Sequence, residues 1–313
     1  MESVIFHVDV NSAFLSWEAV YRIQVKRERL DLRTIPSAVG GDVKKRHGII
    51  LAKSLPAKRY NIQTGESVSE ACKKCPELVL VPPQYELYER CSEAFLSILK
   101  QYSPNVEQYS IDEAYCDMTG TKYIYESPYE ITCEIKDRIY KELGFTFNVG
   151  ISCNKLLAKM ASDLKKPNMV HTLYPKEIKE KMWRLPVSDL FYVGRATTKK
   201  LHTLGIHTIG ELARTDIGIL RSHLKKYGEL IYDFANGRDT SYVIDERPKN
   251  KGYGNSTTIP FDIDNRNAAR MVFLVLAETV CTRLRKDGVS AAVVAISIVD
   301  FEFRHCSHQG RMP

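Results

Sequence analysis

The stretch YSIDEAYCD at residues 109–117 sets two adjacent acids, Asp112 and Glu113, between apolar flanks. The flanks are typical of strands, and the short polar break between them predicts a turn from one strand into its antiparallel neighbour. Such a hairpin carries both carboxylates at its tip. Because adjacent side chains of a regular strand point to opposite faces, the two acids can serve one cation only if the backbone bends there. From this stretch alone, a metal site and an ordinary acidic turn both stay open.

A second acidic stretch lies near the N-terminus, where VIFHVDVNSAF occupies residues 4–14. A β-rich apolar run carries Asp9 near its far end, and the helix-compatible residues 16–20 follow it. This order predicts a strand, a sharp turn and a helix. The sequence therefore places a third acid at the end of a strand.

Together, DVNSAF at residues 9–14 and SIDEAY at residues 110–115 resemble the two catalytic motifs of the Y-family, or translesion, DNA polymerases. The order and spacing of later motifs extend this resemblance over nearly the whole chain. It implies a multidomain α+β fold with a palm, fingers, a helical thumb and a little finger. It also implies error-prone, template-directed addition of dNTPs to a primer 3′-end without proofreading, as in damage bypass by bacterial enzymes.

The composition is that of an ordinary globular protein. The 313 residues are 44% hydrophobic and 27% charged, which predicts several compact units. The 45 Lys and Arg exceed the 38 Asp and Glu, and the resulting formal charge of +7 suits a polyanionic partner. We find no secretory leader and no apolar run of membrane-spanning length. The eight cysteines are scattered, and Cys72 and Cys75 lack a second pair, which indicates reduced thiols in a cytoplasmic protein. The resemblance further implies a bacterial, nucleoid-associated protein.

The resemblance and the changes of pattern along the chain divide it into five parts. The palm takes two segments, and a proline at position 167 marks the change to short helices without a convincing strand. A polar, charged segment then predicts a tether. The expected parts are residues 1–22 and 78–166 for the catalytic palm, 23–77 for the fingers, 167–237 for the thumb, 238–251 for the linker and 252–313 for a partial little finger.

The resemblance assigns metal binding to three acids and one carbonyl group. Asp9 and Asp112 would bridge two Mg²⁺ ions. Glu113 would bind the ion on the hydroxyl side, and the carbonyl of Val10 the ion on the nucleotide side. Oxygen ligands without His or Cys are the type that magnesium favours. The two ions would lower the pKa of the primer 3′-hydroxyl and stabilise the leaving pyrophosphate.

The resemblance also implies contacts to the incoming nucleotide. Phe14 falls where the family keeps a steric gate against the ribose 2′-hydroxyl, and a core role is compatible with that position. In the fingers, Lys58 replaces the Arg of the family's Tyr-Glu-Ala-Arg segment and Leu55 replaces its Tyr; a Lys neutralises phosphate without a bidentate fork. Lys159 falls where a second triphosphate-binding Lys is found, and Lys155 lies four residues earlier on the same helix face. A solvated basic face is the alternative for these lysines.

A helix-hairpin-helix is expected at residues 191–206, whose sequence is FYVGRATTKKLHTLGI. Gly194 would let the hairpin backbone approach a DNA phosphate, and the amides at the helix start would point at the anion. Lys199 and Lys200 add positive charge. Arg195 stands where many copies have a second hairpin glycine.

The C-terminal part resembles the start of a β-α-β-β-α-β little finger without its last helix and strand. The patterns predict strands at residues 254–259, 291–299 and 301–305, and a helix at 265–286. We expect residues 252–313 to be poorly ordered, to be covered by a partner, or to belong to a longer protein. The apolar residues expected to be buried on the helix are Phe273, Leu276, Ala277, Val280 and Leu284.

The implied partners are primer–template DNA, dNTPs and a sliding clamp bound through a C-terminal segment outside this chain. The protein is expected to be a monomer without membrane contact. Two other function classes stay open. A catalytically idle DNA-binding paralogue of the same fold would explain the altered fingers motif. A nucleotidyl cyclase is suggested by Gly40, Gly41 and Asp42, but Val43 and Lys44 replace the Glu and Phe of that signature, so a turn is favoured.

Overall fold

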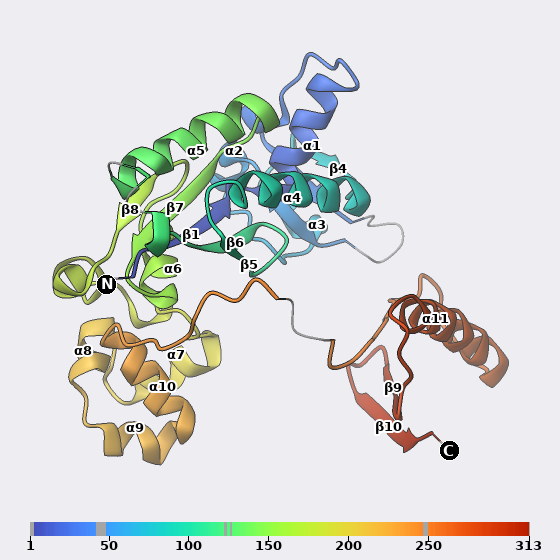
Figure 1. The fold of residues 1–313 in the computed structure, drawn as a ribbon. Coiled ribbons are helices and arrows are strands. Elements are labelled where there is room, and N and C mark those ends of the chain that lie inside the picture. Colours follow the sequence, from blue (N-terminus) through green and yellow to red (C-terminus); the bar gives the residue numbers. More distant parts are fainter. Residues whose placement is uncertain (1–2, 42–47, 122–123, 126, 247–249, 313) are drawn as a thin grey trace. The chain divides into compact units, whose positions relative to one another are not determined.

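The computed structural model describes residues 3–41, 48–121, 124–125, 127–246 and 250–312 (Figure 1). The chain forms two compact units, of which the second begins after residue 247. Gly40 ends a strand at Ser37–Gly40 and Gly41 follows it, whereas Asp42 of the predicted turn and the basic run after it fall at residues 42–47, outside the described part. Eight free cysteines agree with the expectation of reduced thiols.

A five-stranded sheet forms the centre of the first unit. Its central strand, β1, pairs antiparallel with β6 on one side and with β7 on the other. β5 pairs antiparallel with β6, so the hairpin predicted around Asp112 and Glu113 is confirmed. The order is β5-β6-β1-β7-β8, with β1 at Ile5–Val10, β5 at Asn105–Gln108, β6 at Glu113–Asp117, β7 at Phe147–Ser152 and β8 at Val170–Thr172.

Helices cover both faces of this sheet. Phe6, Val8 and Val10 of β1 alternate onto the face that packs against α1, α4 and α5, where aromatic side chains such as Trp17 and Phe95 are fully buried. The opposite face, with Asp9, lies against α6. The helices are α1 at Ala13–Gln24, α4 at Tyr85–Leu99, α5 at Pro128–Leu143 and α6 at Lys155–Asp163.

The expected fingers form a small sheet with a core of its own. β2 lies between an antiparallel neighbour, β3, and a parallel neighbour, β4. Short apolar side chains such as Ala57 and Val68 fill the core, which suits a subdomain of this size. The elements are η1 at Leu32–Thr34, β2 at Ser37–Gly40, β3 at Ile50–Lys53, α2 at Leu55–Lys58, α3 at Val68–Lys74 and β4 at Val79–Val81. β4 joins this sheet although residues 78–166 were expected in the palm.

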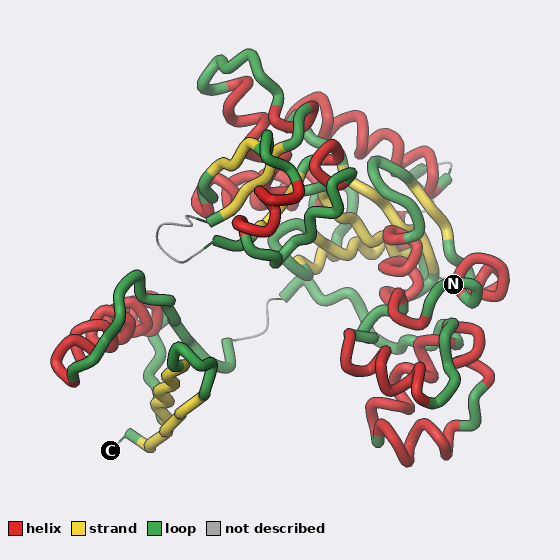
Figure 2. The backbone as a smooth tube through the Cα atoms, turned by 180° about the vertical axis from the view of Figure 1, so that it is seen from behind, coloured by secondary structure: helices red, strands yellow, loops and turns green. Residues whose placement is uncertain are grey.

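Short helices follow the sheet and gather into the thumb (Figures 1 and 2). They have a separate core that includes Leu201, Leu212 and Ile231. The expectation of no strand after position 167 is wrong, because β8 pairs with β7 at the sheet edge; three residues are too few to give a periodic pattern. The thumb elements are η4 at Pro175–Glu177, η5 at Ile178–Met182, η6 at Val187–Asp189, α7 at Arg195–Thr203, α8 at Ile209–Arg214, α9 at Ile217–Leu224 and α10 at Lys226–Ala235. A further short helix, η3 at Thr119–Thr121, follows β6 of the central sheet.

The segment predicted as a tether is bound to the sheet over its first half. The N–H of Ile244 donates to Glu107 of β5 at 3.0 Å, and Val243 packs against the fully buried Tyr115. The carboxylate of Asp239 accepts from the N–H of Leu156 at the start of α6 at 3.0 Å. The first half of this segment therefore packs on the sheet, and its role as a linker between the units stays a prediction.

The second unit contains α11 at Arg266–Lys286 and the antiparallel pair of β9 at Val293–Val299 and β10 at His305–Arg311. Residues 254–259 form no strand, because in the described part of this unit only β9 and β10 pair with each other. The chain turns at Phe303, with a φ of 61°, so the second strand starts later than predicted. None of the five apolar residues expected to be buried on the helix is buried; the predicted packing of α11 is corrected.

Candidate active site

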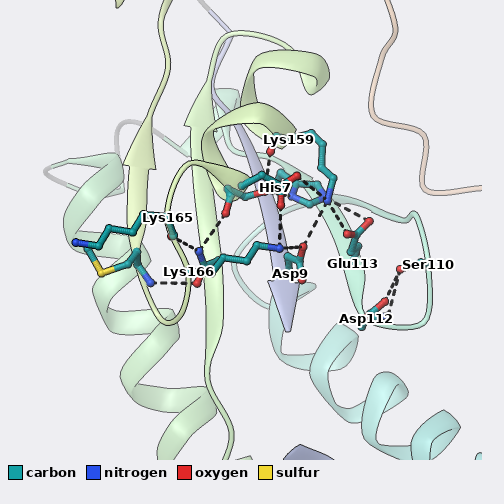
Figure 3. Close-up of polar contacts among 12 residues, drawn as sticks. His7, Asp9, Ser110, Asp112, Glu113, Lys159, Lys165 and Lys166 are labelled. Carbon is teal, nitrogen blue, oxygen red and sulfur yellow. Dashed lines mark hydrogen bonds and ion pairs between the residues drawn. The ribbon is translucent and has the colours of Figure 1, made fainter. Parts of the chain in front are cut away.

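Two carboxylates meet on the α6 face of the central sheet. Asp9 of β1 is the register partner of Glu113 of β6, so their side chains share one face (Figure 3). The Nζ of Lys159 lies 2.6 Å from Oε1 of Glu113 and 3.4 Å from Oδ2 of Asp9. The Nζ of Lys166 lies 2.6 Å from the same Asp9 oxygen, and the carboxylate of Asp163 bonds both lysines. Three acids and two lysines thus form one ionic cluster, in which Asp9, Glu113 and Lys159 are largely buried and Asp163 is exposed.

A glycine in β7 allows α6 to approach the sheet this closely. A Cβ atom on Gly150 would fall well inside contact distance of the Ala158 carbonyl oxygen and the Ser162 nitrogen. Only glycine therefore fits under α6 at this position. This close packing is what brings Lys159 over the two acids.

Asp112 lies beside this cluster at the tip of the hairpin. Its Oδ1 accepts from the hydroxyl of Ser110 at 2.7 Å, and its carbonyl oxygen accepts from the N–H of Val10 at 3.0 Å. The backbone bends as the metal hypothesis requires, because the N–H groups of Tyr109 and Ser110 both donate to the Glu113 carbonyl. The two motif stretches are therefore joined through their backbones.

Burial and the lysines set the charge states of the acids. Burial raises the pKa of Glu113 to about 7, although Lys159 opposes the shift. Burial also raises the pKa of Asp112. For Asp9, burial acts upward, but Lys166 and Lys159 outweigh it and hold the pKa below its usual value. The cluster therefore holds carboxylates that need a nearby cation to stay ionised.

Within the described part of the chain, no three His, Cys, Asp or Glu side chains converge closely enough to hold a metal ion. Lys159 lies between Asp9 and Glu113, and Asp112 bonds Ser110 instead. The donor set is nevertheless the one that a hard cation prefers: carboxylate oxygens, buried, with an ammonium group already bound between two of them. In the type of their donor atoms, though not in the side-chain positions of this structure, these residues suit a magnesium-type ion.

The predicted nucleotide contacts lie at different places. Phe14 is half-buried on α1, with its ring 4.7 Å from that of Tyr88 and nearly parallel to it, at 12°. Lys58 is exposed at the end of α2. Lys155 is not brought to the acids, because its Nζ bonds both carboxylate oxygens of Glu107 at 2.7 Å. Lys155 and Lys159 therefore have different partners, although they lie four residues apart on one helix.

The predicted DNA contacts surround the start of α7. Gly194 is the N-cap residue of this helix, and no side chain caps its first turn. Gly194, Arg195 and Lys199 line an open cavity of about 730 Å³, while Lys200 lies outside its lining. The free amides of the first turn and the basic side chains can receive a phosphate here.

Sequence reasoning did not find Lys166 or His7. Lys166 gives no pattern in a single sequence, since it follows α6 and reaches Asp9 only through the tertiary fold. His7 could have been found, because strand alternation places it on the same face as Asp9. It is fully buried, its Nδ1 lies 2.8 Å from the Ser162 hydroxyl, and burial lowers its pKa well below the usual value.

Family models match three successive segments of the chain. The impB/mucB/samB family model covers residues 8–163, which contain all three motif acids. The chain belongs to this family, the Y-family DNA polymerases. The IMS family HHH motif matches residues 175–206, and the impB/mucB/samB family C-terminal domain matches residues 250–313.

Curated relatives and a solved structure agree with the family assignment. DNA polymerase IV of Clostridium acetobutylicum is 46% identical over 312 residues, covering 100% of this chain and 78% of the relative. DNA polymerase IV 1 of Bacillus subtilis is 40% identical over 296 residues, covering 94% of this chain and 70% of the relative. A Y-family DNA polymerase chimera superposes with a TM-score of 0.83 at 20% identity, covering 99% of this chain and 88% of the chimera, and so shares the fold.

The family assignment decides among the function classes. The polymerase is a DNA-directed DNA polymerase of the translesion type, and neither an idle paralogue nor a nucleotidyl cyclase is favoured. It binds primer–template DNA and dNTPs, and polymerases of this family depend on metal ions. In the part of the chain that the structure describes, no helix has the length and apolarity of a membrane span.

Proposed function

We propose that the cluster around Asp9, Asp112 and Glu113 is where the polymerase joins a dNTP to the primer 3′-end. The observation that carries this proposal is the ammonium group of Lys159 between Asp9 and Glu113, at 3.4 and 2.6 Å from their oxygens. A cationic group already lies where two buried carboxylates from adjacent strands converge. Two Mg²⁺ ions, held by the three acids and the Val10 carbonyl, would supply activation of the hydroxyl and stabilisation of pyrophosphate.

The two lysines then have a role in nucleotide binding. Lys159 and Lys166 neutralise Asp9 and Glu113 while no other cation is bound. With these carboxylates bound to metal ions, the ammonium groups of Lys159 and Lys166 would be free to bind the triphosphate oxygens. Lys58 would add a third positive charge from the fingers, as a point charge. The lysines thus neutralise the negative charge of the carboxylates before the nucleotide binds and that of the phosphates afterwards.

Phe14 and the start of α7 would contact the remaining parts of the substrates. Phe14 is the second residue of α1, five positions after Asp9, and its ring stacks on that of Tyr88, which suits a fixed surface against the ribose. Gly194, Arg195 and Lys199 border the cavity at α7, and we assign them, together with Lys200, to phosphates of the DNA backbone. These contacts read no base sequence.

Three finer proposals rest on the family alone. They are a monomeric protein, association with the nucleoid, and binding to a sliding clamp through a C-terminal segment. A pull-down of the full natural protein with the clamp would test the last of these.

Primer extension with Mg²⁺ tests the site assignment. We expect Asp112→Ala to abolish nucleotide addition while primer–template binding in a gel-shift assay stays near wild type, because the carboxylate acts on substrate and not on the duplex. Asp137→Ala is the matched control, since Asp137 is exposed on α5, and it should extend the primer normally. Full extension by the Asp112 variant would overturn the assignment.

A further inference from the structure

On the face of α1 that carries Phe14, the next side chains along the helix are polar. Phe14, Glu18 and Arg22 are spaced four residues apart and therefore lie above one another on the helix. Gln84 and Tyr88, also four apart, face them at the start of α4. The two helices are thus joined by side chains in register.

Glu18 is the central residue of this hydrogen-bonded row and is fully buried. Its Oε1 accepts from Nε of Arg22 at 2.7 Å. Its Oε2 accepts from Nε2 of Gln84 at 2.7 Å and from the hydroxyl of Tyr88 at 3.4 Å. A buried carboxylate is costly unless its oxygens are bonded in this way, so the arrangement holds only with the partners in place.

Tyr88 transmits this arrangement to Phe14. Its side chain is also fully buried, with the hydroxyl on Glu18 and the ring stacked on Phe14 at 4.7 Å. Trp17 lies 6.0 Å from both rings and closes the other side. Close packing holds the buried ring of Tyr88, and the bond from its hydroxyl to Glu18 adds a directional constraint on the ring. The position of Phe14 therefore depends on a carboxylate one turn away.

We propose that Glu18 is a positioning residue for sugar discrimination, acting through Tyr88 on Phe14. This inference rests on the proposed function, in which Phe14 faces the ribose. Glu18 touches neither substrate nor metal ligand. Through Tyr88, Glu18 fixes the ring of Phe14, which blocks the 2′-hydroxyl of a ribonucleotide. Weakening the hydrogen bonds of Glu18 therefore lets the Phe14 ring move.

Glu18→Gln is the decisive substitution, because it keeps the volume and removes one acceptor. The amide oxygen of Gln can stay on Arg22, but its NH₂ group then replaces the oxygen that accepts from Gln84 and the Tyr88 hydroxyl. Gln84 can turn its own amide oxygen to accept from this NH₂ group, whereas the hydroxyl of Tyr88 loses its acceptor. In primer extension with ribonucleoside or deoxyribonucleoside triphosphates, we expect the ratio of ribonucleotide to deoxyribonucleotide incorporation to rise about tenfold. The rate with dNTPs should stay near wild type. Phe14→Ala should raise the ratio about 100-fold by removing the blocking ring itself.

Two further variants separate positioning from general destabilisation. Glu28→Gln removes the other, exposed partner of Arg22, 3.4 Å away, and should leave the ratio unchanged. The exchange Glu18→Gln with Gln84→Glu restores donor and acceptor matching across the helices and should bring the ratio back towards wild type. Melting temperatures of all variants report folding independently.

The outcomes separate the inference from the proposed function. An unchanged ratio in Phe14→Ala would overturn the steric-gate assignment itself. A raised ratio in Phe14→Ala with an unchanged ratio in a folded Glu18→Gln variant would overturn the role of Glu18 only. If Glu18→Gln does not fold, the exchange variant decides: a wild-type ratio supports the inference, and a raised ratio with a normal melting temperature contradicts it. The Phe14→Ala, Glu18→Gln double variant should match Phe14→Ala alone, because both changes act on the Phe14 ring.

Discussion

The central sheet of the first unit and the β9–β10 pair of the second both contain strongly apolar strands, but these strands differ in burial. β1 and β7 have six residues each, all buried, and β9 has seven, all exposed. The sequence of β9, VVAISIV, is as apolar as that of a strand covered on both faces. In the first unit, helices cover both faces of the sheet. The comparison teaches that strand composition predicts a strand, whereas burial depends on what else packs against it.

The largest expected difference between the two regions concerns catalysis. Glu113→Ala should reduce nucleotide addition by about 10³-fold or more, because it removes a charge that stabilises the reacting groups. Glu302→Ala in the second unit removes an exposed carboxylate paired only with Arg304 at 2.9 Å and should leave single-nucleotide addition within twofold. Single-turnover kinetics measure both. Comparable losses in the two variants would contradict a catalytic site confined to the sheet.

A pair of glycines tests the role of close packing. Gly150→Ala places a methyl group against the backbone of α6 and should lower the free energy of unfolding by about 3 kcal/mol. In β10, a Cβ atom added by Gly310→Ala would meet no atom within 4 Å, so this substitution should change the free energy of unfolding little. Chemical denaturation followed by circular dichroism checks both variants. A Gly150→Ala variant as stable as wild type would show that α6 can move away from the sheet at no cost.

Two valines compare burial directly. Val149 of β7 is 1% exposed and Val294 of β9 is 44% exposed. Val149→Ala should cost about 2 kcal/mol through lost burial and a residual cavity, and Val294→Ala less than about 0.5 kcal/mol. Urea titration gives both values. Equal costs would indicate that β9 is covered in solution, by a partner or by further chain.

The smallest effect is expected for DNA binding by the thumb. Lys199→Ala should lower the slope of log affinity against log salt by about 0.9, the value of one phosphate contact. Lys141→Ala, in the last turn of α5, is the control and should leave the slope unchanged. Fluorescence anisotropy with labelled primer–template over a salt series measures the slopes. The same slope in wild type and Lys199→Ala would remove this lysine from the DNA contact.

The elements that sequence predicted correctly share one property: their pattern is local. The strand and helix around Asp9 and the hairpin around Asp112 and Glu113 follow from alternation and turn residues, and each formed as expected. The strand at residues 254–259 failed because a strand needs a partner, and its apparent β-pattern could not supply one. The packing of the first half of the tether could not be predicted either, because it depends on a long-range partner: the N–H of Ile244 donates to the Glu107 carboxylate of β5.

The sequence by itself determined the kinds of groups and their order: acids at the ends of strands, lysines on a helix, and a glycine followed by basic residues at a helix start. These groups and their order were enough to indicate the family. Only the tertiary structure decided which of these groups meet. Lys155 and Lys159 lie on one helix, yet one bonds Glu107 and the other the acids, while Lys166 reaches Asp9 from beyond the helix end. The physical reason is that helical and strand periods fix a side chain's face, whereas its partners depend on long-range packing, here on how closely Gly150 lets α6 approach β7.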